Sequence, residues 1–232
     1  MSDREPITRT YRFALAVCSP LVRRWGRLEV TGLEHMPESG PVLLIGNHDS
    51  YWDPVAIGIA GLPRRQIRAL AKASLWDIKP LAPILNGMGQ IPIKRGAGDA
   101  GALDAATEQL REGACIGVFP EGTISRGLTL RARSGIGRLA LSVPEAKLVC
   151  VSTAGTVDIV RFPKRPRIRI DFFEPAGGQT DPTEDPGELS ARILAEIRAR
   201  APIALPGRRK RQEKYRLEAE AAAAEAEREK VG

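Results

Sequence analysis

Short apolar runs alternate with segments of helical periodicity along most of this chain. The run at residues 42–45 is apolar at every position, which is typical of a parallel strand buried on both faces. The alternation predicts an α/β layered domain with a mostly parallel central sheet flanked by helices. The expected strands span residues 28–31, 42–46, 67–71, 90–93, 115–119, 148–152 and 167–172. The expected helices span residues 54–61, 75–86, 99–111, 135–141 and 186–200.

The N-terminal segment, residues 7–25, carries apolar residues at near-helical spacing and arginines at other positions. Pro20 prevents one straight helix, so Ser19 and Pro20 are expected to be the cap and the first residue of a second short helix. A basic amphipathic segment that contains a tryptophan, here Trp25, can lie in a membrane interface. The alternative is a helix packed on the domain with its arginines in water. We expect residues 1–27 to form an amphipathic, membrane-associating segment.

Two changes of composition divide the C-terminal part of the chain. Residues 174–187 are rich in Pro, Gly, Asp and Thr, which predicts a loop. After residue 207 the chain becomes a tail of Ala, Glu, Arg and Lys without a large apolar stripe, typical of a solvated, partly helical extension. We therefore expect one domain at residues 28–206 and a helical, charged tail at residues 207–232. The basic start of this tail could bind anionic lipid.

The charge and the cysteines narrow the class of protein. The formal net charge is +7, from 35 basic and 28 acidic residues, which suits phosphorylated ligands, an anionic membrane surface or nucleic acid. With 5% aromatic residues and no recognition motif, nucleic acid is not an expected partner. Three cysteines without metal-binding spacing predict neither a disulfide framework nor a metal site. No apolar run reaches the roughly 18 residues of a membrane-spanning helix, so we expect a protein of the cytoplasm or of the membrane face that borders it.

His48 and Asp53 are the candidate catalytic pair. His48 is one of two histidines in the chain and comes just after the apolar run at residues 42–45. A histidine that is oriented by a carboxylate can take a proton from a hydroxyl group. Two other interpretations remain open. Asp53 precedes Pro54 and could be a helix N-cap, and His48 could be an ordinary loop residue.

Three further polar segments end predicted strands, and ligands gather at the carboxyl ends of strands in open α/β sheets. Residues 88–95 lead from a glycine through a short strand to Arg95, which can bind a phosphate in bidentate fashion. Residues 148–156 end a core strand in a glycine turn. Residues 117–126 lead from a buried strand into a turn whose N–H groups and hydroxyls can hold phosphate oxygens. The candidate positions in this turn are Glu121, Gly122, Thr123, Ser125 and Arg126.

Taken in order, these blocks resemble those of the glycerolipid acyltransferases, the family of the 1-acylglycerol-3-phosphate acyltransferases. The family's first block is Asn-His, four residues, then Asp, and here it is Asn47, His48 and Asp53. Its third block, Phe-Pro-Glu-Gly-Thr-Arg-Ser, matches residues 119–125 except at Ile124, although Arg126 lies two residues further on. Finding both blocks in the family order is the most specific part of the resemblance.

The other two blocks agree less closely. The second, a glycine followed by an apolar strand that ends in arginine, matches residues 89–95, and the fourth matches residues 149–155 with Cys150 in place of a proline. Lys72 and Arg133 fall where the family has basic residues. The resemblance spans roughly residues 25–175.

The resemblance implies transfer of a fatty acyl group from acyl-CoA, or acyl carrier protein, to the free hydroxyl of lysophosphatidic acid. His48 would be the general base, and Asp53 would fix its tautomer and stabilise the imidazolium. The acceptor oxygen would attack the thioester directly, without an acyl-enzyme. Acyl-CoA would be a co-substrate, and no cofactor is expected. Substrate-binding residues would be Asn47, Lys72, Arg95, Glu121, Gly122, Thr123, Ser125 and Arg126, with Glu121 either contacting the acceptor or bracing the loop.

Lipid substrates strengthen the expectation of a peripheral protein at the cytoplasmic face of the cell membrane, bound to its anionic surface. The change at Ile124 leaves other acceptors open: another lysophospholipid, glycerol-3-phosphate or a glycolipid. A non-catalytic lipid-binding or membrane-remodelling protein on the same fold is a further alternative. The intact His48 and Asp53 argue against it.

Overall fold

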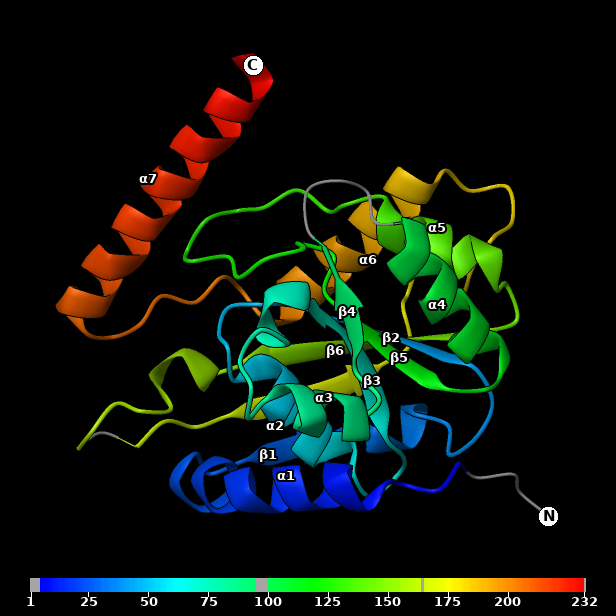
Figure 1. Ribbon diagram of the computed structural model, residues 1–232, viewed down its shortest axis with the longest axis horizontal. Coiled ribbons are helices and arrows are strands. Elements are labelled where there is room, and N and C mark those ends of the chain that lie inside the picture. The colour runs from blue at the N-terminus through cyan, green and yellow to red at the C-terminus, as the bar shows by residue number, and fades with distance from the viewer. Residues whose placement is uncertain (1–4, 95–99, 164, 232) are drawn as a thin grey trace.

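The computed structural model describes residues 5–94, 100–163 and 165–231, with the backbone alone for residue 100 and from residue 222 onward. A seven-stranded sheet in the order β1-β7-β6-β2-β5-β3-β4 forms its centre (Figure 1). Neighbouring strands are parallel except β6 and β7, so the expected mostly parallel sheet is confirmed. In chain order the strands are β1 (Glu29–Thr31), β2 (Val42–Gly46), β3 (Ile67–Lys72), β4 (Ile91–Ile93), β5 (Cys115–Val118), β6 (Lys147–Ala154) and β7 (Arg169–Phe173).

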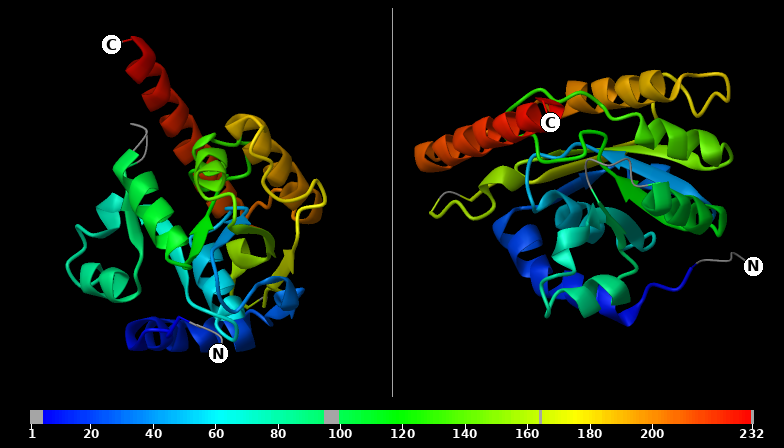
Figure 2. Two further views of the ribbon diagram at one scale, coloured as in Figure 1. Left: turned by 90° about the vertical axis from the view of Figure 1, so that its right-hand side faces the viewer. Right: turned by 45° about the horizontal axis from the view of Figure 1, so that its top comes forward.

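Helices cover both faces of the sheet (Figure 2). The side chains of β2 alternate between two hydrophobic clusters, because successive residues of a strand point to opposite faces. Leu43 and Ile45 pack with the first cluster, beneath α4, α5 and α6, whereas Val42 and Leu44 pack with the second, beneath α1 and α2. The longer helices are α1 (Arg9–Ser19), α2 (Asp53–Gly61), α3 (Ala82–Gly87), α4 (Ala100–Arg111), α5 (Gly135–Ser142), α6 (Pro186–Arg200) and α7 (Arg209–Val231).

The N-terminal helices pack into the second cluster. Thr8 caps α1 by accepting a hydrogen bond from the Tyr11 N–H at 3.2 Å, and Tyr11 and Leu15 are buried. A second helical segment, η1 (Pro20–Trp25), begins at Pro20 as expected, but Ser19 is helical and its side chain caps nothing. Ser19 thus holds the expected N-cap position of η1 without a capping hydrogen bond, because the chain continues from one helix into the other without leaving helical backbone angles.

One expected helix is shorter than predicted. Residues 75–86 were expected to be helical, but they contain only the end of a short turn, η3 (Ala73–Leu75), and most of α3. Pro80 and Pro83 explain the difference, since proline lacks the N–H that continues a helix and tolerates only its first turn. Pro83 accordingly lies in the first turn of α3.

The charged C-terminal tail forms α7, whose C-terminal end projects away from the sheet (Figure 1). Its start is attached to the domain near η4 (Thr156–Asp158), where the Arg211 guanidinium donates to the Val157 carbonyl at 3.2 Å. Within the described ranges, no helix is both long enough and apolar enough to cross a membrane.

Candidate active site

The imidazole of His48 lies against the carboxylate of Asp53, with 3.1 Å between Nδ1 and Oδ2. His48 belongs to the turn that leaves β2, and Asp53 begins α2. Asp53 is fully buried, and its Oδ2 also accepts the N–H groups of Asp49 and Ser50, each at 2.7 Å. Its Oδ1 accepts the Thr156 hydroxyl at 2.5 Å. An acceptor surrounded by four donors fixes the hydrogen of His48 on Nδ1 and leaves Nε2 as the free base.

The interpretation of Asp53 as a helix N-cap does not fit the geometry. Trp52 occupies the N-cap position of α2, and the Asp53 carboxylate binds N–H groups of the preceding turn. His48 is nearly buried in the turn after β2, with 9% of its side chain exposed. Phe119 stacks on the imidazole, with ring centres 4.3 Å apart and planes 16° from parallel.

The turn after β5 holds the backbone of His48 on both sides. Glu121 Oε2 accepts the His48 N–H at 2.8 Å, and the Ser125 N–H donates to the His48 carbonyl at 2.8 Å. Burial raises the pKa of Glu121, while the hydrogen bond from Arg198 opposes the rise. Both carboxylate oxygens of Glu121 thus have a partner within the protein, the His48 N–H and the Arg198 guanidinium.

A buried charge cluster lies behind His48 and Asp53. The Arg198 guanidinium of α6 forms two hydrogen bonds with the Asp49 carboxylate, at 2.8 and 2.9 Å, and one with Glu121. The Ser125 hydroxyl also donates to Asp49. Sequence reasoning missed Arg198 and Asp49. The available signal was a second aspartate directly after His48, at a position that a buried strand leads into.

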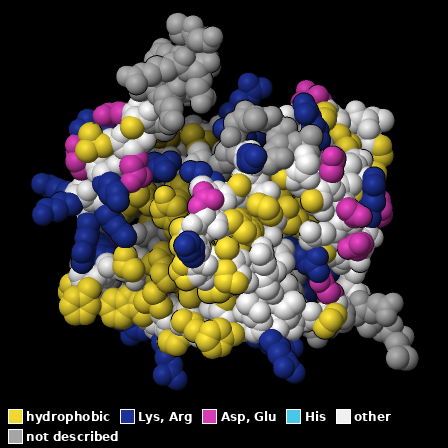
Figure 3. All heavy atoms as spheres, viewed as in Figure 1, with side chains coloured by type: hydrophobic (Ala, Val, Ile, Leu, Met, Phe, Trp, Pro, Cys, Tyr) yellow, Lys and Arg dark blue, Asp and Glu magenta, His cyan; other side chains and the backbone are white. Residues whose placement is uncertain are grey.

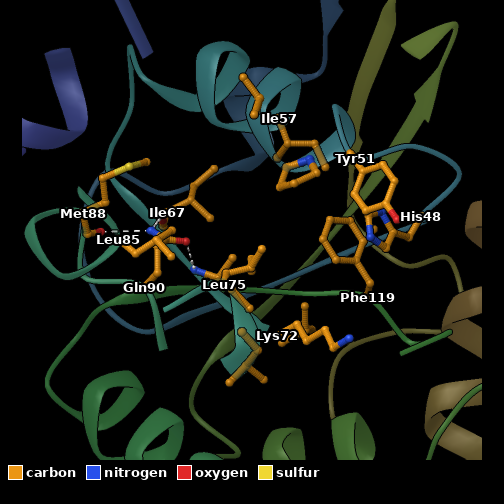
Figure 4. A pocket seen from close by; sticks show the side chains of 18 of the residues that line it. His48, Tyr51, Ile57, Ile67, Lys72, Leu75, Leu85, Met88, Gln90 and Phe119 are labelled. Carbon is orange, nitrogen blue, oxygen red and sulfur yellow. Dashed lines mark hydrogen bonds between the residues drawn. The ribbon is translucent and has the colours of Figure 1, made fainter. Parts of the chain in front are cut away.

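A cavity of about 500 Å³ opens from His48 into the second hydrophobic cluster. Figure 4 shows His48, Tyr51 and Phe119 at one end, and Met88 and Leu85 at the other. Its wall is mainly apolar and includes residues of α1, α2, α3, β3 and β5. Four of the expected site residues line it: His48, Lys72, Thr123 and Arg126.

Three expected substrate contacts have other partners. Asn47 is fully buried, and its amide donates to the Thr153 carbonyl at 2.9 Å and accepts the Thr153 N–H at 2.8 Å, which ties β2 to β6. The Gly122 N–H donates to the Phe119 carbonyl at 3.0 Å. The Ser125 hydroxyl binds Asp49. None of these three residues lines the cavity, and Arg95 lies outside the described residues.

Gly122 has a conformational role. Its φ is +67°, and an added Cβ would lie 2.5 Å from the Arg133 side chain. Only glycine adopts this backbone without strain and leaves room for that guanidinium. Gly122 therefore shapes the turn that holds His48.

Arg126 has an unusual backbone for a residue other than glycine, with a φ of +51°. Its side chain lines the cavity and is 21% exposed. Its Nε donates to the Glu218 carboxylate of α7 at 2.8 Å. Sequence reasoning placed the tail apart from the site and missed this contact. The neighbouring Ile124, which stands where the family motif has arginine, is buried and contributes to the apolar wall.

The buried thiols offer no competing nucleophile. Cys115 and Cys150 are fully buried side chains of β5 and β6, and burial raises the pKa of each to about 12. A thiol with such a pKa stays protonated near neutrality and reacts poorly.

Comparisons with known proteins found similar sequences and a similar fold. The acyltransferase family model matches residues 27–159. A 1-acyl-sn-glycerol-3-phosphate acyltransferase of Borreliella burgdorferi is 36% identical over 119 residues, which are 50% of this chain and 46% of the relative. A protein of the same name from Bacillus subtilis is 25% identical over 169 residues, 73% of this chain and 74% of the relative.

A lyso-ornithine lipid O-acyltransferase of Pseudomonas aeruginosa is 35% identical over 112 residues, 46% of this chain and 39% of the relative. The chain thus spans less than half of the Borreliella and Pseudomonas relatives. The crystal structure of a 1-acyl-sn-glycerophosphate acyltransferase from Thermotoga maritima superposes with a TM-score of 0.60 over 82% of this chain and 80% of that chain. At 20% identity this likeness supports the fold.

Proposed function

Because this chain belongs to the acyltransferase family, we propose that it transfers a fatty acyl group from a thioester donor to the free hydroxyl of lysophosphatidic acid, giving phosphatidic acid. The donor is acyl-CoA or acyl carrier protein. The observation that carries the proposal is the His48–Asp53 pair, with a contact of 3.1 Å, whose histidine lines a cavity with apolar walls.

In the proposed reaction His48 takes the proton of the acceptor hydroxyl through Nε2. The acceptor oxygen attacks the thioester carbonyl, the C–S bond then breaks, and His48 returns the proton to the departing thiolate. Asp53 stabilises the imidazolium between these steps. The high pKa of Cys115 and Cys150, about 12 for each, supports direct transfer without an acyl-enzyme.

The cavity fits the acyl chain. About 500 Å³ lies within the roughly 300–1,000 Å³ range of small-molecule sites. Its apolar wall would stabilise the chain by about 0.8 kcal/mol for each buried methylene. The long axis of the cavity leads from His48 toward Leu85 and Met88, so a chain buried there would leave its thioester carbonyl beside the base (Figure 4).

Cations near the opening suit the acceptor phosphate. Arg126, Lys72 and Thr123 line the cavity and supply two positive charges and a hydroxyl group. A guanidinium binds phosphate by charge-assisted hydrogen bonds. Arg126 is paired with Glu218, so a bound phosphate would replace one anion by another.

An exposed apolar surface supports attachment to a membrane. Hydrophobic side chains gather on the face that carries α1, α2 and α3, beside groups of Lys and Arg (Figure 3). On α1, Phe13 and Val17 are 73% and 65% exposed, while Tyr11 and Leu15 of the same helix are buried. The helix thus packs on the domain with one face and offers the other to a lipid surface. We propose that the protein is peripheral and binds an anionic membrane surface.

Another lysolipid acceptor is the second candidate. Ile124 is apolar where the family motif has arginine, and the Arg126–Glu218 pair places both signs of charge at the opening. A headgroup with an ammonium group and an anion would meet both charges. The Pseudomonas relative is named for such a lipid class, lyso-ornithine lipid.

The proposal is tested by mass spectrometry of the products that the purified chain forms on liposomes. Acyl-CoA and acyl carrier protein donors are each combined with lysophosphatidic acid, other lysophospholipids and lyso-ornithine lipid. We expect phosphatidic acid as the main product, and a loss of at least about 100-fold in His48→Ala, since general base catalysis contributes roughly 10²–10⁴-fold. His35→Ala is the matched control, because His35 is the second histidine and lies on the surface.

Absence of product with every donor and acceptor would contradict acyl transfer and favour a lipid-binding role. A His48→Ala variant that keeps more than about a hundredth of the wild-type rate would contradict the role of His48 as general base.

A further inference from the structure

The Arg198 cluster lies outside the reaction described above. Arg198 belongs to α6, beyond the residues 27–159 that the family model matches, and it does not line the cavity. We propose that Arg198 is a positioning residue that holds the His48 turn in its catalytic geometry by bridging Asp49 and Glu121. This inference rests on the proposed function.

The bridge is almost closed to water. The side chains of Asp49 and Glu121 are 3% and 1% exposed, and that of Arg198 is 15% exposed. Asp49 takes both nitrogens of the guanidinium fork, at 2.8 and 2.9 Å, and one of these nitrogens also reaches Glu121. A planar fork can satisfy two carboxylates at once, whereas the ammonium of lysine is a point charge.

Asp49 and Glu121 are each joined to the catalytic pair by one hydrogen bond. The backbone N–H of Asp49 donates to the Asp53 carboxylate at 2.7 Å. The Glu121 oxygen that does not contact Arg198, Oε2, accepts the His48 N–H at 2.8 Å. Movement of Asp49 would therefore shift Asp53, and movement of Glu121 would shift His48, so the 3.1 Å contact between the pair depends on both.

Repulsion between the two carboxylates makes the cation necessary. Without Arg198, two buried negative charges would face each other beside Asp53, which is also buried. Buried charges without a partner either take up a proton or move toward water, and both responses would disturb the turn. The hydrogen bonds that Asn47 and Ser125 give to Asp49 do not neutralise it.

The test compares three substitutions on α6. Arg198→Met removes the bridge, and Arg198→Lys keeps the charge without the fork. The matched control is Arg192→Met, because Arg192 lies on the same helix and forms a similar two-bond pair with Glu184, at 2.7 and 2.9 Å, away from His48. The rate kcat is measured per folded molecule, with the folded fraction taken from circular dichroism.

We expect kcat to fall about 100-fold in Arg198→Met, since misplacement of reacting groups by about 1 Å can cost that much. For Arg198→Lys we expect a loss of roughly tenfold, since one carboxylate keeps a partner. The KM values for donor and acceptor should stay within about twofold, because Arg198 touches neither binding region. Arg192→Met should keep its wild-type kcat. A kcat per folded molecule in Arg198→Met equal to that of Arg192→Met would overturn the proposal, as would a change in KM alone.

The second part of the test asks whether neutral side chains at positions 49 and 121 restore the kcat of Arg198→Met. Adding Asp49→Asn and Glu121→Gln to Arg198→Met removes the repulsion while both side chains keep an acceptor oxygen. We expect this triple variant to recover at least about tenfold in kcat over Arg198→Met, since an apolar or neutral network avoids the unpaired charge. No recovery would contradict the proposal.

A measurement without substrate separates this inference from the proposed function. The chain has two histidines, so the ring of His48 can be followed by nuclear magnetic resonance with His35 as the internal reference. We expect the His48 signals to broaden or multiply in Arg198→Met and to stay sharp in Arg192→Met, with His35 unchanged in both. Unchanged His48 signals would overturn the positioning role even if the wild-type chain transferred no acyl group. Absence of acyl transfer by the wild-type chain, with the expected His48 signals, would contradict the proposed function alone.

Discussion

Replacing Asp53 by asparagine removes the charge of the catalytic pair while keeping its shape. The Asp53 Oδ2 accepts three N–H groups, from His48, Asp49 and Ser50, and Oδ1 accepts the Thr156 hydroxyl. An asparagine oxygen can keep the first three contacts. Its amide nitrogen would then face Thr156, whose hydroxyl can turn and accept. The variant should therefore fold with His48 in the same tautomer.

The size of the effect follows from the geometry. In the proposed transfer His48 would become an imidazolium, and its Nδ1 lies 3.1 Å from the Asp53 oxygen. Two unit charges about 4 Å apart interact by about 4 kcal/mol at an effective dielectric constant near 20. Because about 1.36 kcal/mol corresponds to a factor of ten in rate, kcat of Asp53→Asn should fall roughly 10³-fold. Weaker hydrogen bonds from the three N–H groups should lower the free energy of unfolding by about 1–3 kcal/mol.

The assay measures kcat at saturating donor and acceptor, together with urea unfolding of each variant. Thr156→Val is the matched control, because it removes the fourth donor to the carboxylate but keeps the charge. Its kcat should fall by at most about 10–100-fold, less than in Asp53→Asn, in line with loss of one hydrogen bond to a charged group worth roughly 1.5–3 kcal/mol.

The outcome for Asp53→Asn distinguishes an electrostatic role of Asp53 from a purely structural one. A folded variant with kcat within tenfold of the wild type would refute the electrostatic role of Asp53. A rate that falls only in proportion to the folded fraction would make Asp53 a structural residue. Equal losses in Asp53→Asn and Thr156→Val would refute the assignment of the effect to the charge.

Three other predictions concern the acceptor, the acyl chain and the membrane. Arg126→Gly keeps the left-handed backbone, whose φ is +51°, and should raise the acceptor KM about 10–100-fold, since hydrogen bonds to a charged group contribute roughly 1.5–3 kcal/mol. Glu218→Gln should lower the same KM by up to about fivefold, because a partly exposed ion pair contributes at most about 1 kcal/mol; a fall in both variants would contradict phosphate binding at Arg126. Ala69→Phe fills part of the cavity wall and should shift the preferred donor to shorter chains in a competition assay read by mass spectrometry; an unchanged chain-length profile would count against the cavity as the acyl site. The double change Phe13→Ser and Val17→Ser should weaken co-sedimentation with anionic liposomes at least about tenfold while leaving the melting temperature within a few degrees, and undiminished co-sedimentation would exclude the outer face of α1 as the lipid contact.

The order of strands and helices was largely predictable from local patterns. The run at residues 42–45 forms β2 with every side chain buried, and the expected α/β layered fold with a mostly parallel sheet is confirmed. The resemblance to the acyltransferases is confirmed by the family model. The main local error concerned residues 75–86, where apolar spacing outweighed the effect of Pro80 and Pro83.

His48 and Asp53 could be paired from the sequence because they are five residues apart, on one turn between a strand and a helix. Short separation makes such contacts a matter of local geometry. The sequence could not show which of the expected substrate-binding residues line the cavity and which only hold the backbone in place. Asn47 and Ser125 look like binding residues in the sequence, but their partners, Thr153 and Asp49, are brought to them by the packing of neighbouring strands and turns.

Arg198 marks what the tertiary structure alone decided. In the sequence, Arg192, Arg198 and Arg200 are three similar cations on one amphipathic helix. Their roles differ because Leu189, Ile193 and Ile197 pack in the first hydrophobic cluster, which sets the rotation of α6 about its axis. That rotation places Arg198 against Asp49, 149 positions away along the chain, and leaves Arg200 half exposed beside Asp171. Local pattern thus determined the strands, the helices and the catalytic pair, whereas long-range packing decided which charges meet behind that pair.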